Sequence, residues 1–137
     1  MESSKKLIIY TDGGARGNPG PAAIGVIVGN KNYGEAIGNT TNNVAEYKAV
    51  IFALKKAKAL LGGDKAKETE LEIRSDSELL VSQVKGEYKI KDEELQPLFV
   101  DVWNKMQNFK KVNFVLIPRE KNREADTLVN RALDILF

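Results

Sequence analysis

The chain has 137 residues, of which 42% are apolar and 29% charged, and its formal net charge is +2. This size and composition predict a single domain over residues 1–137 with one hydrophobic core. The sequence holds neither Cys nor His, which excludes disulfides, thiolate metal sites and every nucleophile pair that needs a histidine base. Any hydrolytic chemistry must then use carboxylates, hydroxyls, lysines or a hard metal ion.

Two further expectations concern location and partners. No apolar run approaches the roughly 20 residues that cross a bilayer, and Met1 to Lys6 lacks the apolar stretch of a secretion signal. We therefore expect a cytoplasmic protein without membrane contact, acting as a monomer. A net charge of +2 is too small to predict a nucleic-acid partner, because phosphate binding depends on locally clustered cations.

The first half of the chain predicts three strands and a long helix. Leu7 to Thr11 is apolar or β-branched and reads as a central strand that stops at the turn Asp12-Gly13-Gly14. After a loop over residues 16–21, strands are expected at Ala23 to Val28 and Tyr33 to Gly38, with a turn at 29–32. Helical spacing of apolar residues begins at Asn43 and ends before Gly62-Gly63, a favoured helix end.

The second half predicts alternating strands and helices. The expected elements are a strand at Leu71 to Ser75, helices from about Ser77 to Val84 and Glu93 to Gln107 around a turn near Gly86, a strand at Val112 to Ile117, and a closing helix from Asn122 to Leu136. The order βββαβααβα predicts an α/β fold in which helices flank a five-stranded mixed sheet whose first three strands are antiparallel.

Four acids occupy strand ends or helix starts, and each also has a purely structural interpretation. The role of Asp12 could be merely to form a turn, and that of Asp76 merely to cap the helix that it opens. Glu46 lies on the apolar stripe of its helix, but with Asn43 as the N-cap it could complete a capping box. Asp126 lies in the first turns of the last helix, where its role could be merely a favourable interaction with the helix dipole.

Their joint placement favours a functional interpretation. In a sheet with helices beside it, strand ends and helix starts can converge, and four neighbouring carboxylates would repel one another. Cations would remove that repulsion, and an all-oxygen set of ligands suits Mg²⁺ or Mn²⁺. Paired ions of this kind serve phosphodiester hydrolysis.

Four segments then resemble the motifs of the type-1 ribonuclease H family, in the order that the family has. They are Tyr10 to Pro21, Thr41 to Glu46, Ser75-Asp76-Ser77 and Pro118 to Asp126. The first is highly specific, and together the four span almost the whole chain. The resemblance implies the ribonuclease H-like fold, which agrees with the order of elements read from the sequence.

The resemblance also implies an activity. It assigns Asp12, Glu46, Asp76 and Asp126 as catalytic ligands of two Mg²⁺ ions, with Mn²⁺ as an alternative and Asp12 bridging both. The expected enzyme is an endoribonuclease that cuts the RNA strand of RNA–DNA hybrids and leaves 5′-phosphate and 3′-hydroxyl ends.

Several residues match positions that contact nucleic acid in the family. Asn18, Asn42 and Asn43 match positions that sense the RNA 2′-hydroxyl, and Thr41 matches one that holds a DNA phosphate. Turn formation and helix capping remain open as alternative roles for them. The complete set of expected nucleic-acid contacts is Gly13, Asn18, Thr41, Asn42, Asn43, Glu78 and Asn122.

The sequence departs from the family in three places. The stretch before Asp126 has no histidine, which many members carry on a loop there. Only Gly86 to Asp92 separates the two middle helices, so the basic handle helix of some members is missing. Glu78 stands where the family often has an amide. The remaining cations near the loop, which surround Tyr88, either contact DNA or form a plain surface turn; they are Lys85, Lys89 and Lys91.

Three alternatives stay open. A non-catalytic nucleic-acid-binding module on the same fold would have lost at least one of the four acids. A structural or protein-interaction domain would show no convergence of the acids and no magnesium dependence. A third alternative stays within the enzyme class and adds cleavage of double-stranded RNA.

Overall fold

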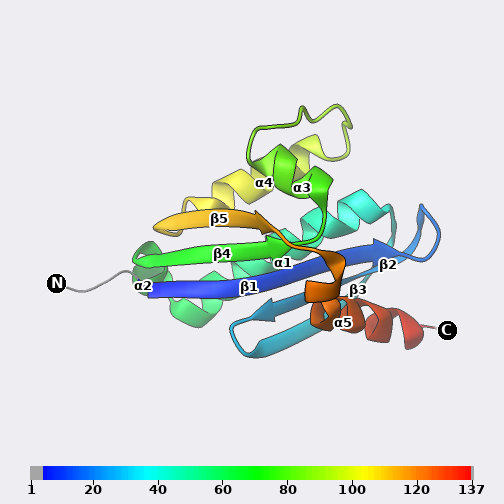
Figure 1. Cartoon of the computed structure of the whole chain (residues 1–137), viewed down its shortest axis with the longest axis horizontal. Helices are drawn as coiled ribbons and strands as arrows, with labels where there is room; N and C mark the ends of the chain where they lie inside the picture. Colours follow the sequence, from blue (N-terminus) through cyan, green and yellow to red (C-terminus); the bar gives the residue numbers. More distant parts are fainter. Residues whose placement is uncertain (1–4, 137) are drawn as a thin grey trace.

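The structure is a computed structural model that describes residues 5–136, so most of Met1 to Lys6 lies outside the described part. Five strands form one sheet in the order β3-β2-β1-β4-β5 (Figure 1). The strands are β1 (Lys5–Ala15), β2 (Gly20–Val28), β3 (Lys31–Thr40), β4 (Thr69–Ser75) and β5 (Lys111–Leu116). The helices are α1 (Asn42–Leu61), α2 (Gly63–Lys67), α3 (Glu78–Val84), α4 (Gln96–Met106), the 3-10 helix η1 (Arg119–Lys121) and α5 (Arg123–Asp134).

Strand β1 is the central strand, as the sequence predicts. It pairs antiparallel with β2 and parallel with β4, and β2 pairs antiparallel with β3. The expected mixed sheet with three antiparallel strands is thus confirmed. The predicted end of the strand at Asp12-Gly13-Gly14 is wrong, because β2 continues to pair with β1 as far as Ala15. The parallel pairing with β4, in contrast, stops at Tyr10 and Arg74.

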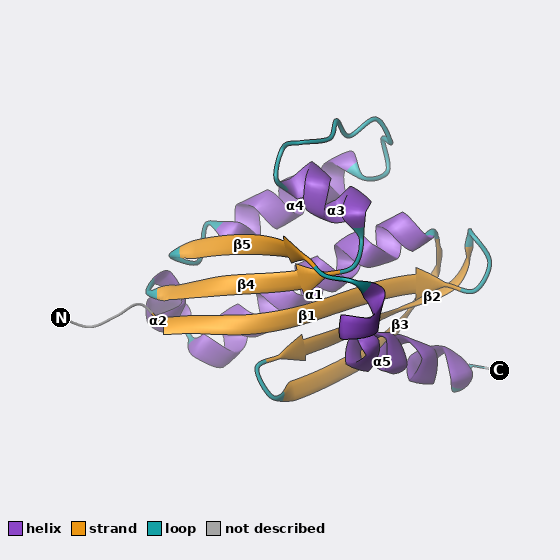
Figure 2. Cartoon of the chain, in the orientation of Figure 1, coloured by secondary structure: helices purple, strands orange, loops and turns teal. Residues whose placement is uncertain are grey.

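The main hydrophobic core lies between the sheet and α1. Helix α1 contacts β1 and β2 and also α4, and Figure 2 shows α1, α3 and α4 on the same side of the sheet. Tyr47, Val50 and Leu54 of α1 are almost fully buried, against Ile9 of β1 and Ile73 of β4. Burial of several such side chains contributes about 1.5–3 kcal/mol each, so this face supplies most of the stability of the fold.

Helix α5 covers the other face of the sheet, over β2 and β3. Its core is small and consists of Ala23, Val129 and Leu133, with Ala132 beside it. A Cβ atom on Gly25 would lie 2.1 Å from the carbonyl oxygen of Ala125, so only glycine lets α5 come this close to the sheet.

Three helix boundaries differ from the prediction. Helix α1 has Thr41, not Asn43, as its N-cap. Helix α4 starts at Gln96, because residues 92–95 form a turn and Pro97 fits only a first helical turn. The described helix α5 ends at Asp134 instead of the predicted Leu136, whose side chain is exposed.

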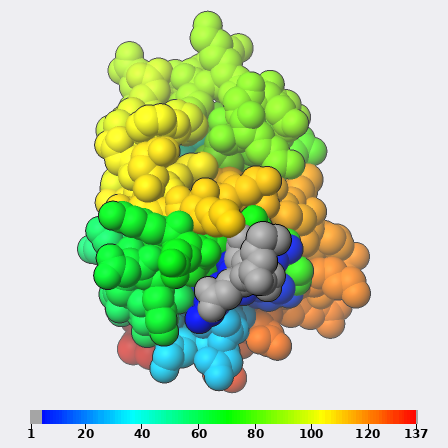
Figure 3. Space-filling view, turned by 90° about the vertical axis from the view of Figure 1, so that its left-hand side faces the viewer, coloured from blue at the N-terminus to red at the C-terminus, as the bar shows by residue number. Residues whose placement is uncertain are grey.

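The short helix α2 was not predicted at all. Figure 3 views the molecule from the end at which β1 begins, with α2 in green and α4 in yellow on one side. The loop of residues 85–95, in yellow-green, forms the top of the molecule in this view and in Figure 1. None of the described helices is long and apolar enough to cross a membrane.

Candidate metal centre and nucleic-acid interface

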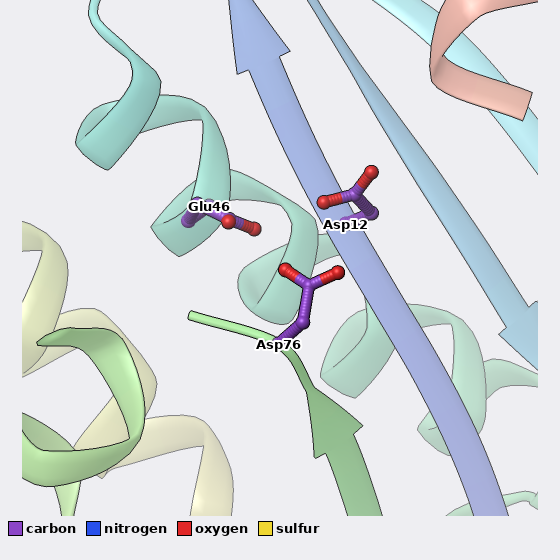
Figure 4. A group of neighbouring side chains, drawn as sticks. All are labelled: Asp12, Glu46 and Asp76. Atoms are coloured by element: carbon purple, nitrogen blue, oxygen red, sulfur yellow. The ribbon is translucent and has the colours of Figure 1, made fainter. Parts of the chain in front are cut away.

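Three of the four predicted acids meet at one edge of the sheet. One carboxylate oxygen from each of Asp12, Glu46 and Asp76 lies within 4.8 Å of the others. Figure 4 shows the three side chains pointing toward one another from β1, from α1 and from the residue after β4. The sequence predicted this convergence although the three residues are far apart in the chain.

The parallel pairing of β1 and β4 brings Asp12 and Asp76 together. Asp12 lies two residues beyond the last residue of β1 that pairs with β4, and Asp76 directly follows Ser75 at the end of β4. Asp76 does not cap α3, since the Ser77 side chain accepts the hydrogen bond from Leu80 N, at 3.2 Å. The capping interpretation of Asp76 is therefore wrong, and its carboxylate faces the acids.

Gly13 brings Glu46 into the cluster. A Cβ atom at Gly13 would lie 2.3 Å from the backbone of Ala45, so glycine is needed for the start of α1 to contact β1. At this close approach Gly13 N–H donates a hydrogen bond of 2.9 Å to Glu46 Oε1. Because Thr41 caps α1, Glu46 lies beyond the capping-box position, and the capping interpretation is wrong here as well.

Asp126 lines the same cleft but lies outside the group of three. The cleft has a volume of about 330 Å³ and is lined by all four acids and by Arg119. Asp126 is exposed in the first turn of α5, and its carboxyl interacts with that of Asp12. The structure therefore places three acids within reach of one ion and the fourth beside them.

Burial and mutual repulsion disfavour the charged forms of the central acids. Asp12 is 8% exposed, and its desolvation, followed by repulsion from Asp76 and Asp126, raises its pKa to about 8. Desolvation and repulsion from Asp12 and Asp76 also raise the pKa of Glu46 well above its usual value. The Gly13 N–H and the Arg119 guanidinium oppose this second shift only in part.

A bound cation would relieve the repulsion that the protein alone leaves in place. The available donors are carboxylate oxygens, which hard divalent ions prefer, and the cleft gives such an ion access from solvent. The residues therefore fit a metal site made by Asp12, Glu46 and Asp76. Arg119 is a charged group of this cleft that the sequence motifs did not assign a role.

Two predicted substrate contacts are hydrogen-bonded to the backbone, one of them, Asn42, in the lining of the cleft. The side-chain oxygen of Asn42 accepts a hydrogen bond from Ala15 N at 2.8 Å, and that of Asn18 accepts one from Asn42 N at 3.0 Å. Both amide oxygens are thus used inside the protein. Among the described residues no acceptor is found for either amide nitrogen, so both exposed asparagines keep donors for a ligand.

Thr41 and Asn43 lie on either side of Asn42 at the start of α1. The Thr41 hydroxyl accepts a hydrogen bond of 3.2 Å from Val44 N, which is the capping role considered for it. Its proton remains available for donation to a phosphate oxygen. Asn43 is exposed on the first turn of the helix.

Glu78 lies at the start of α3, two residues after Asp76. Its carboxylate accepts a hydrogen bond of 2.9 Å from the hydroxyl of Tyr88, which is 46% exposed in the loop of residues 85–95. Ser82 O accepts from the backbone N–H groups of residues 87 and 88, and the Gln83 amide donates to Lys89 O. Several hydrogen bonds thus fix the loop to α3, and they restrict the backbone that carries the loop lysines.

Gly13 and Asn122 are not exposed to a ligand in the way the sequence suggested. Gly13 is buried and its N–H binds Glu46. Asn122 is 1% exposed, and its amide nitrogen donates to Thr11 O at 2.9 Å and to Asp76 Oδ2 at 3.3 Å. Both residues support the acids from within the protein, which motif spacing alone could not reveal.

The fold and the cleft together define an α/β protein with a cluster of carboxylates at the edge of a mixed sheet, and this cluster could hold a metal ion. Comparison with known proteins agrees with that class. The family described as reverse transcriptase-like matches residues 10–132. The bifunctional protein Rv2228c of Mycobacterium tuberculosis is 39% identical over 136 residues, which cover 94% of this chain and 36% of that protein.

Ribonuclease HI of Halobacterium salinarum is 38% identical over 131 residues, which cover 91% of this chain and 63% of that protein. Among solved structures, LC11-RNase H1 in complex with an RNA/DNA hybrid is 48% identical, with a TM-score of 0.88, over 95% of this chain and 98% of that one. The chain belongs to the type-1 ribonuclease H family. It spans only about a third of the mycobacterial relative, which is a longer protein.

Proposed function

We propose that this protein is an endoribonuclease that hydrolyses the RNA strand of RNA–DNA hybrids with the help of two Mg²⁺ ions. The observation that carries the proposal is the meeting of Asp12, Glu46 and Asp76 within 4.8 Å in a cleft open to solvent. Membership of the ribonuclease H family and the hybrid-bound structure of LC11-RNase H1 support the choice of substrate.

The four acids would hold the ions, with Asp12 at the centre of the group. When bound, Mg²⁺ supplies a positive charge that lowers the pKa of an attacking water and offsets charge on the leaving 3′ oxygen. This mechanism needs no side-chain nucleophile, which agrees with a chain that has neither Cys nor His. The residues of the chain would hold the ions and orient the substrate. The products would carry 5′-phosphate and 3′-hydroxyl ends.

The protein fixes Glu46 through one of its two carboxylate oxygens. Its Oε1 atom accepts from Gly13 N–H, and the charge of Arg119 favours its ionised form. A carboxylate fixed in this way presents its second oxygen in one direction. We infer that Arg119, which lines the cleft, also attracts the phosphate backbone of a substrate.

The asparagines on the rim would distinguish RNA from DNA. A 2′-hydroxyl is both donor and acceptor, and the amide nitrogens of Asn18 and Asn42 can donate to it while their oxygens stay bound inside the protein. The Thr41 hydroxyl and Asn43 extend this row of polar groups along the start of α1.

The loop of residues 85–95 would contact the DNA strand of the hybrid. Lys85, Lys89 and Lys91 provide positive charge, and Tyr88 is exposed enough to stack on a sugar or base. The hydrogen bonds to Ser82 and Gln83 reduce the ordering cost of such a contact.

The test is a cleavage assay with end-labelled RNA–DNA hybrid, double-stranded RNA and single-stranded RNA, each with Mg²⁺, Mn²⁺ or EDTA. We expect metal-dependent cutting of the hybrid's RNA strand and products that a 5′-phosphate-dependent exonuclease degrades. Asp12→Asn should abolish cutting while the fold remains intact. Preference for double-stranded RNA would change the substrate, and no cutting with any metal would leave a binding module. Light scattering during gel filtration tests the expected monomer.

A further inference from the structure

Asn122 is an amide side chain buried directly beneath the carboxylate cluster. It lies between η1 and α5, at the N-cap position, yet its side chain makes no capping hydrogen bond. Asparagine usually occupies that position because it can cap. Here the side chain turns inward and leaves the residue only 1% exposed, so another role has to explain it.

The amide nitrogen of Asn122 joins the two segments that carry the metal-ligand candidates of the sheet. It donates to Thr11 O at 2.9 Å, immediately before Asp12, and to Asp76 Oδ2 at 3.3 Å. An amide group has two N–H donors, and these two acceptors use both. Asp76 thereby has one oxygen directed toward Asn122, which restricts the orientation of its carboxylate.

The backbone of Asn122 adds a third connection. Its carbonyl oxygen accepts a hydrogen bond of 3.1 Å from Asp126 N. One residue therefore contacts the backbone next to Asp12, the carboxylate of Asp76 and the backbone of Asp126. Since α5 packs on the sheet through a small core, this contact is well placed to fix the start of α5 relative to β1 and β4.

The local hydrogen bonding is not arranged for stability alone. Among residues 5–136, two buried side-chain polar atoms have no hydrogen-bond partner, namely Asn122 Oδ1 and Thr11 Oγ1. These atoms belong to the two residues that the hydrogen bond from Asn122 Nδ2 to Thr11 O joins, next to Asp12. Buried unpaired acceptors destabilise a fold, and departures from full pairing gather at functional sites.

We propose that Asn122 is a positioning residue that orients the Asp76 carboxylate toward Asp12 and so sets the affinity of the site for divalent cations. The inference rests on the proposed metal-dependent function and deepens it. Groups that orient the ligands of a metal commonly change its affinity by about 10–100-fold when they are removed. Asn122 would act without touching either the metal or the substrate.

The test compares Mn²⁺ binding by the wild-type protein and by Asn122→Ser, measured by isothermal titration calorimetry without substrate. Serine removes both N–H donors but is itself a favoured N-cap, so the start of α5 should remain folded. We expect the Kd for Mn²⁺ to rise at least about tenfold. Asn122→Thr, which also caps helices, is a second variant for the case that the first does not fold.

Gln83→Leu is the matched control. Gln83 is also a buried amide, 4% exposed, which bonds to Tyr47 and to Lys89 O away from the acids. It should lose stability and keep the wild-type Kd for Mn²⁺. A folded Asn122 variant with the wild-type Kd would overturn this inference alone. A wild-type protein that binds no Mn²⁺ and cuts no hybrid would overturn the proposed function with it.

Discussion

The two faces of the sheet hold their acids in different ways. On the α1 face, a large core fixes the helix, and Gly13 N–H binds Glu46 directly. On the α5 face, Ala23, Val129 and Leu133 form the core, and Asp126 is exposed. The four acids line one cleft where the two faces meet. Glu46 is therefore the fixed carboxylate of this cleft, and Asp126 is the more adjustable one.

Glu46 and Asp126 should contribute unequally to catalysis. Glu46→Gln should lower kcat for hybrid cleavage by at least roughly 10³-fold, because Glu46 belongs to the group of three acids and is fixed by Gly13. Asp126→Asn should lower kcat by only about 10–10²-fold. Single-turnover cleavage at saturating Mg²⁺ measures both. Equal losses in the two variants would contradict the difference between the faces.

The two close-approach glycines test the same difference through stability. Gly13→Ala would push a Cβ atom into the backbone of Ala45, and Gly25→Ala would push one into Ala125 O. Both overpack the fold, but α1 cannot move without opening the main core. We expect Gly13→Ala to cost more than about 3 kcal/mol and Gly25→Ala about 1–3 kcal/mol, from urea unfolding. The reverse order would show that α5 is the more rigid helix.

The arrangement of the fold was predictable where the pattern of residues determines it. Runs of apolar and β-branched residues bounded by turn residues predicted the five strands and their order along the chain, and the placement of the acids at strand ends and helix starts predicted the convergence of Asp12, Glu46 and Asp76. The end of β1 was missed because an Asp-Gly pair favours a turn locally, whereas pairing with β2 keeps it extended.

The supporting residues could not be predicted in the same way. The spacing of Asn122 in its motif suggested a contact with nucleic acid, but its burial depends on how η1 and α5 meet the sheet. The close approach at Gly13 depends likewise on the depth at which α1 packs. Tertiary packing sets the distances between segments that are far apart in the sequence, and local sequence patterns do not reveal them.

The pKa of Asp12 predicts how stability depends on pH in the absence of metal. Its pKa is raised from 3.8 to about 8, so between these values the folded state keeps a proton that the unfolded chain has released. Stability should therefore fall as the pH rises through this window. We expect wild type to lose on the order of 2 kcal/mol more than Asp12→Asn between pH 5 and pH 9, since relaxation reduces so large a shift.

Urea unfolding in EDTA at the two pH values measures this difference. Saturating Mg²⁺ should remove it, because a bound cation favours the ionised carboxylates. A wild-type protein that is no more sensitive to pH than Asp12→Asn would show that burial and repulsion do not raise the pKa of Asp12 in the folded state.

The smallest expected effect concerns the far end of α5. Arg16 in the β1–β2 loop forms an ion pair of 2.6 Å with Asp134, and both side chains are exposed. Asp134→Asn should cost less than about 1 kcal/mol in urea unfolding, because exposed ion pairs contribute little. Hybrid cleavage should stay at the wild-type rate. A larger loss would mean that the ion pair, rather than the small core, holds α5 on the sheet.

We infer that the acids where the two faces meet form a cation site. Calorimetric titration of the wild-type protein and Asp12→Asn with Mn²⁺ at pH 7.5 tests it most directly. We expect saturable binding by wild type and a loss of at least about tenfold in affinity in the variant, whose fold is checked by circular dichroism. Equal binding by the two proteins, or none by a folded wild type, would contradict it.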